Sequence, residues 1–254
     1  VDSRPNRKRS TGPIPMVAVA VLLSAATAAW GADWPHWRGP SYDGATTETD
    51  LPDTWSKTEN VAWVTDLPGP GAATPIVQDD RVFISSTDAK ADTLNALALD
   101  RATGKILWNH KVATGAARDR RSTYASGSPV TDGTLVVYYY GNGHLAAFGF
   151  AGEKLWHRNI CEDYGEFAFL WTYSASPLLH EGKLYIQVLQ RNVPVQGRGK
   201  SDGPIDSYLL ALDPKTGKSL WNGCSNCSHR TLSWAYSQYG LPIGSVSRIG
   251  TRGG

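Results

Sequence analysis

Cysteine has the most distinctive chemistry of any residue in this chain, and it occurs three times, as Cys161, Cys224 and Cys227. The spacing of Cys224 and Cys227, with His229 close by, is typical of a metal or redox pair. A structural metal site needs a second pair of ligands, and Ser228 stands where a c-type haem motif carries its histidine. We therefore expect the cysteines to be incidental and to form no metal or redox centre.

The histidines and acidic residues form no clearer motif. Six histidines fall in different parts of the sequence, and no pair has a helix or turn spacing that suits a metal: His36, His110, His144, His157, His180 and His229. Asp163 and Glu166 could serve as metal ligands, but acidic residues in a connecting loop are more often solvated. Motifs of serine hydrolases, phosphate-binding loops and HExxH zinc enzymes are absent from the sequence. The sequence therefore assigns no catalytic, cofactor-binding or metal-binding residue.

A repeat is the strongest pattern in the chain, and it must position whatever chemistry the chain has. Residues 98–108 read Ala-Leu-Asp-Arg-Ala-Thr-Gly-Lys-Ile-Leu-Trp, residues 211–221 repeat this pattern, and residues 147–156 carry a shorter version. Asp can accept hydrogen bonds from amides two residues on, Gly can take a positive φ, and Trp can fill the wedge between sheets. We predict this structural role for Asp100, Gly104, Trp108, Gly152, Trp156, Asp213, Gly217 and Trp221.

Each repeat reads as four short strands. A unit begins at Thr74-Pro75, Ser128-Pro129 or Ser176-Pro177, and a reverse turn with an acidic residue follows. An apolar strand, a third strand, the turn of the repeated motif and a fourth strand ending near the Trp complete the unit.

The spacing of the tryptophans indicates which fold these units build. Trp63, Trp108, Trp156 and Trp221 are separated by 45, 48 and 65 residues, and the surplus in the last interval lies in a loop at 190–206. One blade of a β-propeller has about 40–50 residues and four strands. We predict an all-β fold, a β-propeller of four-stranded antiparallel blades that is incomplete, with about three blades and an N-terminal arm at 33–60.

The two ends of the chain do not follow the repeat. Basic residues at 7–9, an apolar run at 16–29 and small residues after it predict a signal peptide at 1–32, export to the periplasm or beyond the cell, and no stable membrane span after cleavage. The partial propeller is assigned to 33–222. The tail at 223–254 is predicted to be disordered or frame-altered in a truncated copy, with an oligomer that completes the ring as the alternative. Without residues 1–31 the formal net charge falls from +2 to −1, which gives no electrostatic case for binding nucleic acid.

With Ala-x-Asp-x-x-Thr-Gly-Lys-x-x-Trp at 98–108 and 211–221, the chain resembles the pyrroloquinoline-quinone (PQQ)-type β-propeller repeat family over residues 33–221. The opening Trp34-Pro-His-Trp-Arg-Gly-Pro40 and the loop at 193–199 resemble exported bacterial propellers likened to the propeller subunit of the outer-membrane β-barrel assembly machinery. In such relatives the N-terminal strand completes the last blade. That blade is missing here, so the resemblance implies that the arm has no partner.

Two functions follow from this resemblance. The first is a non-catalytic exported scaffold that binds proteins or peptides of the cell envelope, because arginine and aromatic side chains are frequent contact anchors. Its expected contact residues are Tyr164, Trp171, Arg191, Arg198 and Asp202, with packing between blades as the alternative role for the aromatic ones. This scaffold is the preferred interpretation.

The alternative function is a quinone (PQQ)-dependent dehydrogenase. That chemistry needs the cofactor held between flat groups on the propeller axis, a calcium ion bound by oxygen ligands, and a carboxylate as general base. Dehydrogenases of this family carry two adjacent cysteines against the quinone, and no two cysteines are adjacent here. We therefore expect neither PQQ nor calcium to be bound, and an enzyme is the less favoured outcome.

Overall fold

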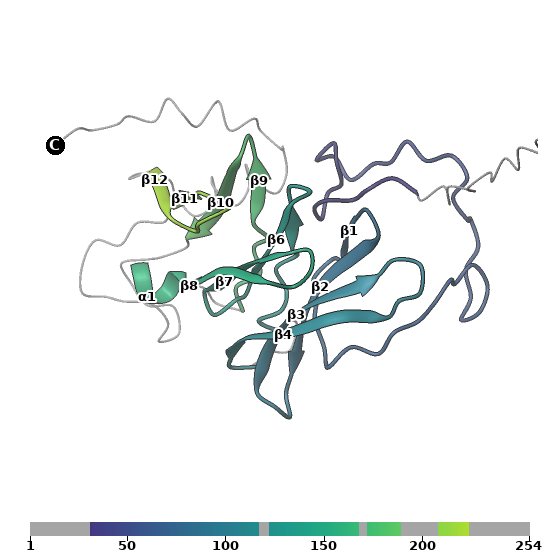
Figure 1. Ribbon diagram of the computed structural model, residues 1–254, viewed down its shortest axis with the longest axis horizontal. Helices are drawn as coiled ribbons and strands as arrows, with labels where there is room; N and C mark the ends of the chain where they lie inside the picture. Colours follow the sequence, from purple (N-terminus) through teal and green to yellow (C-terminus); the bar gives the residue numbers. More distant parts are fainter. Residues whose placement is uncertain (1–30, 117–121, 168–171, 189–207, 224–254) are drawn as a thin grey trace, which may run out of the picture. The chain divides into compact units, whose positions relative to one another are not determined.

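The computed structural model describes residues 31–116, 122–167, 172–188 and 208–223 (Figure 1). Their regular structure consists of three four-stranded antiparallel sheets and one short helix, which confirms the predicted all-β fold with propeller-type blades. These three sheets do not close on one another, as expected for an incomplete propeller.

The predicted signal peptide and tail lie almost entirely outside the described residues, and both stay predictions. No helix in the described part of the chain is long and apolar enough to cross a membrane.

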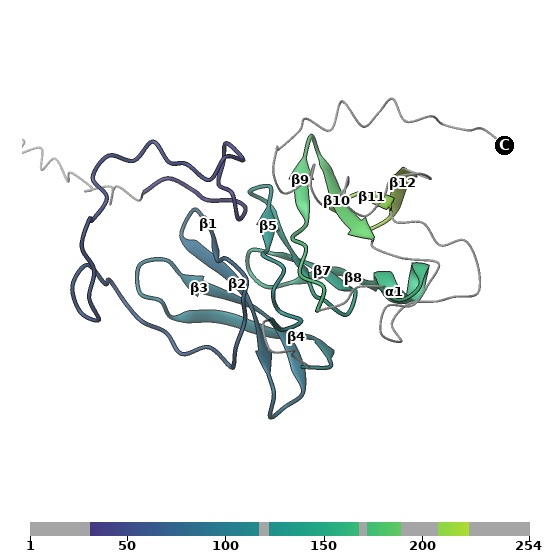
Figure 2. The ribbon, with the colours of Figure 1, turned by 180° about the vertical axis from the view of Figure 1, so that it is seen from behind.

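Each sheet is built from four strands that follow one another in the chain, and β5 is best seen from behind (Figure 2). The first sheet contains β1 (Ile76–Gln78), β2 (Arg81–Asp88), β3 (Thr93–Asp100) and β4 (Ile106–Thr114). The second contains β5 (Val130–Thr131), β6 (Leu135–Tyr139), β7 (His144–Gly149) and β8 (Lys154–Asn159), and α1 (Ile160–Tyr164) follows it. The third contains β9 (Leu178–His180), β10 (Lys183–Val188), β11 (Tyr208–Leu212) and β12 (Ser219–Gly223).

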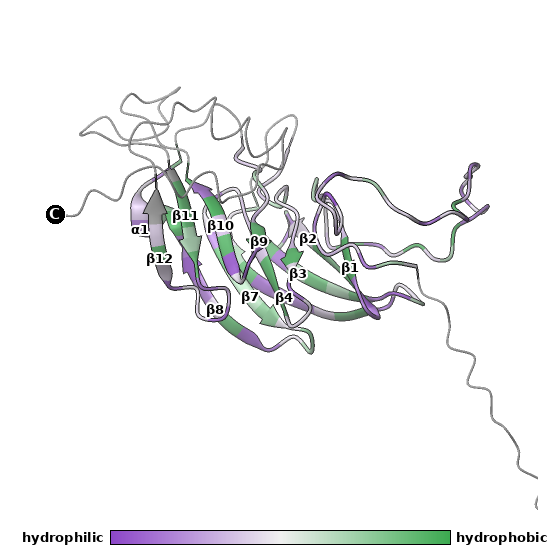
Figure 3. Cartoon of the chain, turned by 90° about the horizontal axis from the view of Figure 1, so that it is seen from above, coloured by the Kyte–Doolittle hydropathy of each residue, from purple (hydrophilic) through white to green (hydrophobic). Residues whose placement is uncertain are grey.

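The strands carry many hydrophobic residues (Figure 3), and most of the buried ones belong to the second and third strands of each unit. Successive side chains of a strand point to opposite faces, so β6 can serve both of its neighbours. Tyr138 belongs to a cluster that contains Phe83 and Leu94 of the first sheet. Tyr139, the next residue, belongs to a second cluster that contains Leu184 of the third sheet. The run of aromatic residues in β6 therefore joins all three blades.

A tryptophan of one unit docks on the motif turn of the next. The indole nitrogens of Trp63, Trp108 and Trp156 donate hydrogen bonds to the carbonyl oxygens of Arg101, Phe150 and Pro214, over 2.9, 3.0 and 2.8 Å. The ring of each tryptophan also covers the glycine of that turn, in the pairs Trp63–Gly104, Trp108–Gly152 and Trp156–Gly217. These glycines have φ values of +69°, +97° and +69°. A Cβ on them would lie 2.3, 2.9 and 2.7 Å from a tryptophan ring atom, so glycine is required by both backbone conformation and space.

The first motif turn differs in detail from the sequence prediction. Asp213 accepts a hydrogen bond from the amide two residues on, at Lys215, as expected. Asp100 instead accepts from the amide and hydroxyl of Thr103, three residues on, over 2.8 and 2.7 Å. These hydrogen bonds to the charged form lower the pKa of Asp100.

The fourth strand of this blade also continues past Trp108 to Thr114, because β3 pairs with it along its whole length.

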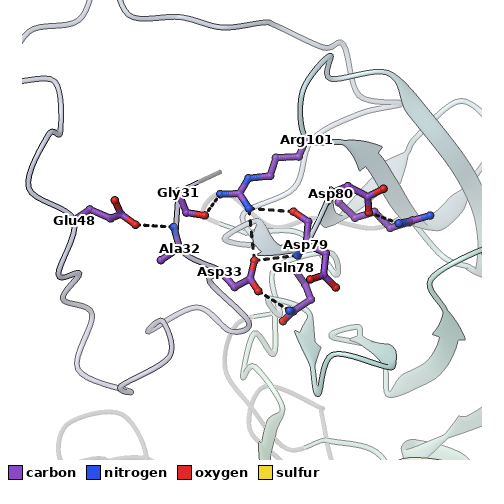
Figure 4. A network of polar contacts seen from close by, with 9 residues as sticks. Gly31, Ala32, Asp33, Glu48, Gln78, Asp79, Asp80 and Arg101 are labelled. Carbon is purple, nitrogen blue, oxygen red and sulfur yellow. Dashed lines mark hydrogen bonds and ion pairs between the residues drawn. The ribbon is translucent and has the colours of Figure 1, made fainter. Parts of the chain in front are cut away.

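The N-terminal arm has partners, contrary to the expectation that it would have none. Asp33 accepts hydrogen bonds from the side chain of Gln78 (2.6 Å) and the amide of Asp79 (2.9 Å), and it lies 3.5 Å from the Arg101 guanidinium (Figure 4). Arg101 also donates to the carbonyl oxygen of Gly31. An ion pair with three further hydrogen bonds therefore fixes the start of the arm on the first blade.

The arm then contacts the innermost strand of every described sheet. The backbone amides of Trp34 and Val77, a residue of β1, each donate a hydrogen bond to the carbonyl oxygen of the other. The carbonyl oxygen of Pro35 accepts from the amide of Thr131 in β5 over 3.0 Å, and the hydroxyl of Tyr42 donates to Leu179 in β9 over 2.9 Å. The sequence prediction assumed that the arm could pair only with a last blade. The arm instead contacts β1, β5 and β9, the first strands of the three described blades.

The Ser or Thr before proline at the start of each unit links successive blades. The Ser128 hydroxyl accepts the amide of Thr74, and the Ser176 hydroxyl accepts the amide of Ser128, over 2.9 and 3.0 Å. The amides of Thr74 and Ser128 precede the first strand of their blades, so a serine hydroxyl from the next blade supplies their hydrogen-bond acceptor.

Replacing Ser128 with alanine is expected to lower the free energy of unfolding by about 1–2 kcal/mol, because a part-buried amide loses its acceptor. Urea denaturation followed by tryptophan fluorescence measures this loss. Thr134→Ala is the matched control, since its hydroxyl bonds only to Asp132 in an exposed turn. An equal loss in both variants would show that the link between blades contributes nothing.

Candidate functional site

A pocket of about 460 Å³ lies at the end of the second sheet. The turn from β6 to β7 and the end of β8 meet at this edge, because His144 at the start of β7 pairs with Asn159 at the end of β8. The connection from β8 to the third sheet starts here with α1, whose first amide, at Ile160, donates to the carbonyl oxygen of Gly143 over 2.8 Å. The pocket is therefore built from connections between strands, held in place by two hairpins.

Aromatic side chains form the buried wall of the pocket. Phe167 and Tyr173 have ring centroids 4.5 Å apart, and Tyr139 of β6 lies edge-on to both. The hydroxyl of Tyr173 donates to the carbonyl oxygen of Gln187 in β10 over 2.6 Å, and burial raises the pKa of this phenol well above its usual range. Tyr173 is thus a neutral, fixed group that ties the pocket to the third blade.

Amide and carboxylate groups form the opposite wall. Asn142 lies in the turn after β6 and donates to the carbonyl oxygen of Thr114 over 3.3 Å, whereas its Oδ1 atom is buried and has no hydrogen-bond partner among the described residues. Asn159 caps α1 by accepting the amide of Cys161 and donating to Glu162. Glu166 adds a second carboxylate to the lining. A buried acceptor oxygen without a donor is suited to a cation or to a ligand hydroxyl.

Cys161 also lines the pocket, as a free thiol. Burial is the main cause that raises the pKa of Cys161 to about 11, and the carboxylates of Glu166 and Glu162 act in the same direction. A thiol with this pKa stays protonated near pH 7, so it serves neither as a nucleophile nor as a thiolate ligand.

The two acidic residues singled out in the sequence have different roles. Asp163 is paired with Arg158, over 2.7 Å to Nε and 2.6 Å to a terminal nitrogen, and so it is not available as a ligand. Glu166 lines the pocket. Across the described residues, no three histidine, cysteine or acidic side chains converge as a metal cluster.

The predicted contact residues are placed only in part. Tyr164 ends α1, where its ring packs against the cluster shared by the second and third sheets and its hydroxyl lies 2.7 Å from Ser219. These contacts agree with the alternative role predicted for the aromatic residues, which is packing between blades. The other four, Trp171, Arg191, Arg198 and Asp202, lie outside the described residues, and their contact with envelope proteins stays a prediction.

Sequence reasoning missed the amide groups of the pocket, Asn142 and Asn159. Neither belongs to a motif, and each matters because a strand turn or end brings it to a shared edge. The predicted hairpin from β7 to β8 gave a signal for Asn159, since pairing Ala147 with Trp156 places it opposite His144. Asn142 carried no comparable signal.

Comparison with known proteins adds a family and several distant relatives. A family model described as outer membrane protein assembly factor BamB matches residues 29–193. Polyvinylalcohol dehydrogenase from a Pseudomonas species is 27% identical over 165 residues, which cover 63% of this chain and 24% of that protein. The chain thus spans about a quarter of the length of this relative.

Solved structures with similar coordinates share little sequence with the chain. BamB from Moraxella catarrhalis has a TM-score of 0.40 and 16% identity over 63% of this chain and 42% of that one. Quinohemoprotein alcohol dehydrogenase from Comamonas testosteroni has a TM-score of 0.41 and 20% identity over 61% of this chain and 21% of that one. A europium-containing methanol dehydrogenase has a TM-score of 0.40 and 15% identity, covering 59% and 24%.

These relatives correct the preferred function from the sequence. A non-catalytic binding scaffold was expected, whereas the curated relative that matches is a dehydrogenase, which favours the alternative. The resemblance of the repeat to PQQ-type propellers is confirmed by the family match, and that match covers more than half of the chain. The chain belongs to the family of PQQ-like repeat β-propellers whose model is described as outer membrane protein assembly factor BamB.

Proposed function

We propose that this chain is part of the propeller of an exported, quinone-dependent alcohol dehydrogenase. The observation that carries the proposal is the 27% identity to polyvinylalcohol dehydrogenase over 165 residues. The proposed reaction removes two electrons and two protons from an alcohol to give a carbonyl compound, and a bound quinone supplies the electron acceptor. The proposed substrates are alcohols, including hydroxylated polymers.

The pocket fits the calcium ion of such an enzyme. Calcium prefers carboxylate and amide oxygens, and the pocket offers the partnerless Oδ1 of Asn142 and the carboxylate of Glu166. Asn142 and Glu166 are therefore the residues of this pocket that would hold the ion.

The same pocket does not fit the quinone itself. PQQ carries several carboxylates, and the residues that line the pocket include two glutamates and no basic side chain. The described lining therefore suits a cation better than the organic cofactor, and no catalytic step is assigned to these residues.

Titration of PQQ into the full chain with and without Ca²⁺ tests the proposal. We expect calcium-dependent quenching of tryptophan fluorescence, and oxidation of polyvinyl alcohol with a dye as final electron acceptor. Glu166→Gln is expected to weaken the calcium dependence at least about tenfold, because it removes a charged ligand. Glu153→Gln, an exposed acid in the turn before β8, is the matched control. If PQQ and Ca²⁺ leave the fluorescence unchanged, the proposal is wrong and the sequence-based expectation of no cofactor holds.

A further inference from the structure

Two histidines that are far apart in the sequence meet on the second blade. His144 begins β7 and His157 lies in β8, where Ala146 pairs with His157 and His144 pairs with Asn159. Residues two apart on a strand share a face, so His144 and His157 are diagonal neighbours on one face of the hairpin. Their rings are nearly parallel, with centroids 5.2 Å apart, and His144 Nδ1 lies 3.1 Å from His157 Nε2.

The distance between these two nitrogens is the distance that a shared metal ion imposes. Two imidazoles on a tetrahedral Zn²⁺, each at about 2.0–2.1 Å, place their nitrogens roughly 3.3 Å apart. The two nitrogens already lie 3.1 Å apart, so binding of the ion would require almost no change in the distance between them. The backbone pairing of β7 with β8 places the two residues side by side, and their rings are already in contact without an ion.

We propose that His144 and His157 form a binding site for a divalent transition-metal ion, held through His144 Nδ1 and His157 Nε2. Without metal, one of these nitrogens donates its proton to the other in a hydrogen bond. On binding, the donating ring moves that proton to its other nitrogen, so that both facing nitrogens offer lone pairs and no net proton is released. Imidazole ligands suit Zn²⁺, Ni²⁺ and Cu²⁺ rather than calcium or magnesium, which separates this site from the calcium pocket proposed above.

Lys154 and Glu162 are the charged side chains that act on the two rings. Burial is the main cause that lowers the pKa of both histidines; their closeness lowers that of His144 further, and Lys154 lowers that of His157. The carboxylate of Glu162 acts in the opposite direction and raises the pKa of both rings, so it favours a bound cation beside them. Since no third histidine, cysteine or acid converges here in the described part of the chain, water completes the coordination.

Isothermal titration of Zn²⁺ into the full chain tests the site. Cys224, Cys227 and His229 lie outside the described residues and could bind Zn²⁺ themselves, so the measurements use a Cys224→Ser/Cys227→Ser background. In this background we expect one tight equivalent of Zn²⁺ and an increase in Tm, because the ion binds the folded hairpin and not the unfolded chain. His144→Gln and His157→Gln are each expected to weaken binding at least about tenfold and to abolish the increase in Tm.

His180→Gln is the matched control, because His180 is a partly exposed strand histidine that lies 3.8 Å from a carboxylate, that of Glu181. It is expected to bind Zn²⁺ like the background. Circular dichroism without metal shows whether each variant is folded, and the substituted positions are exposed enough for glutamine to be tolerated. Zn²⁺ binding that is equal in the background and both hairpin variants would overturn the proposal, and so would an equal loss in His180→Gln.

Discussion

Replacing Gly152 with alanine is expected to lower the free energy of unfolding by about 3 kcal/mol or more. Gly152 has a φ of +97°, which costs a residue with a Cβ about 1–2 kcal/mol. The added Cβ would lie 2.9 Å from two atoms of the Trp108 ring, and overpacking of this kind costs a further 1–3 kcal/mol or so. Trp108 cannot move aside easily, because it is buried and its indole nitrogen is bonded to Phe150.

Gly133 in the same blade separates these two effects. It has a φ of +87°, and nothing lies within 4 Å of a Cβ added there. Gly133→Ala is therefore expected to cost only the backbone contribution, about 1–2 kcal/mol. Urea denaturation of both variants measures the difference, and equal losses would show that the tryptophan exerts no steric constraint on the turn.

A double-mutant cycle with Trp108→Ala completes the argument. Trp108→Ala alone is expected to cost about 3–5 kcal/mol through the cavity that it leaves. With the ring removed, alanine at position 152 still meets the Nε2 atom of His110 at 2.9 Å but no longer the tryptophan, so Gly152→Ala should then cost less than it does in the wild type. Strict additivity of the two losses would contradict the docking role of this pair.

The sequence predicted the blades because their pattern is local and occurs three times. Asp100, Gly104 and Trp108 lie within one hairpin, and the same types recur at 147–156 and 211–221. What the pattern could not show is that Gly104 is covered by Trp63 of the preceding unit rather than by its own Trp108. The repeat marks both partners of each docking contact, but only the packing of one sheet on the next pairs them.

Contacts formed once in the chain were harder to predict. The arm binds through Asp33 and through single backbone contacts of Trp34 and Pro35, none of which has a periodic signature. The histidine pair was within reach of sequence reasoning. The predicted turn between β7 and β8 sets the register that brings His144 and His157 together. Helix and turn spacings do not reveal such a pair, because its residues lie on two different strands.

Acid is expected to destabilise the fold through His36, in the arm that crosses the inner strands. His36 is 4% exposed, its Nδ1 accepts the amide of Arg38 over 2.9 Å, and its buried Nε2 has no hydrogen-bond partner among the described residues. Its ring lies 4.3 Å from that of Tyr42, which in turn lies against His180. Burial, followed by the positive charge of Arg38, lowers the pKa of His36 from 6.5 to about 4.

The folded protein therefore binds fewer protons at His36 than the unfolded chain does between pH 6.5 and pH 4. The stability that comes from keeping this ring neutral is fully present above pH 6.5 and is lost as the pH falls towards 4, with a total of about 3 kcal/mol. In His36→Asn the amide oxygen can still accept the Arg38 amide but does not titrate. Unfolding free energies measured from pH 7 to pH 4 should fall less steeply in this variant than in the wild type. The difference between the two curves isolates His36, and parallel curves would mean that this ring has the same pKa in the folded arm as in the unfolded chain.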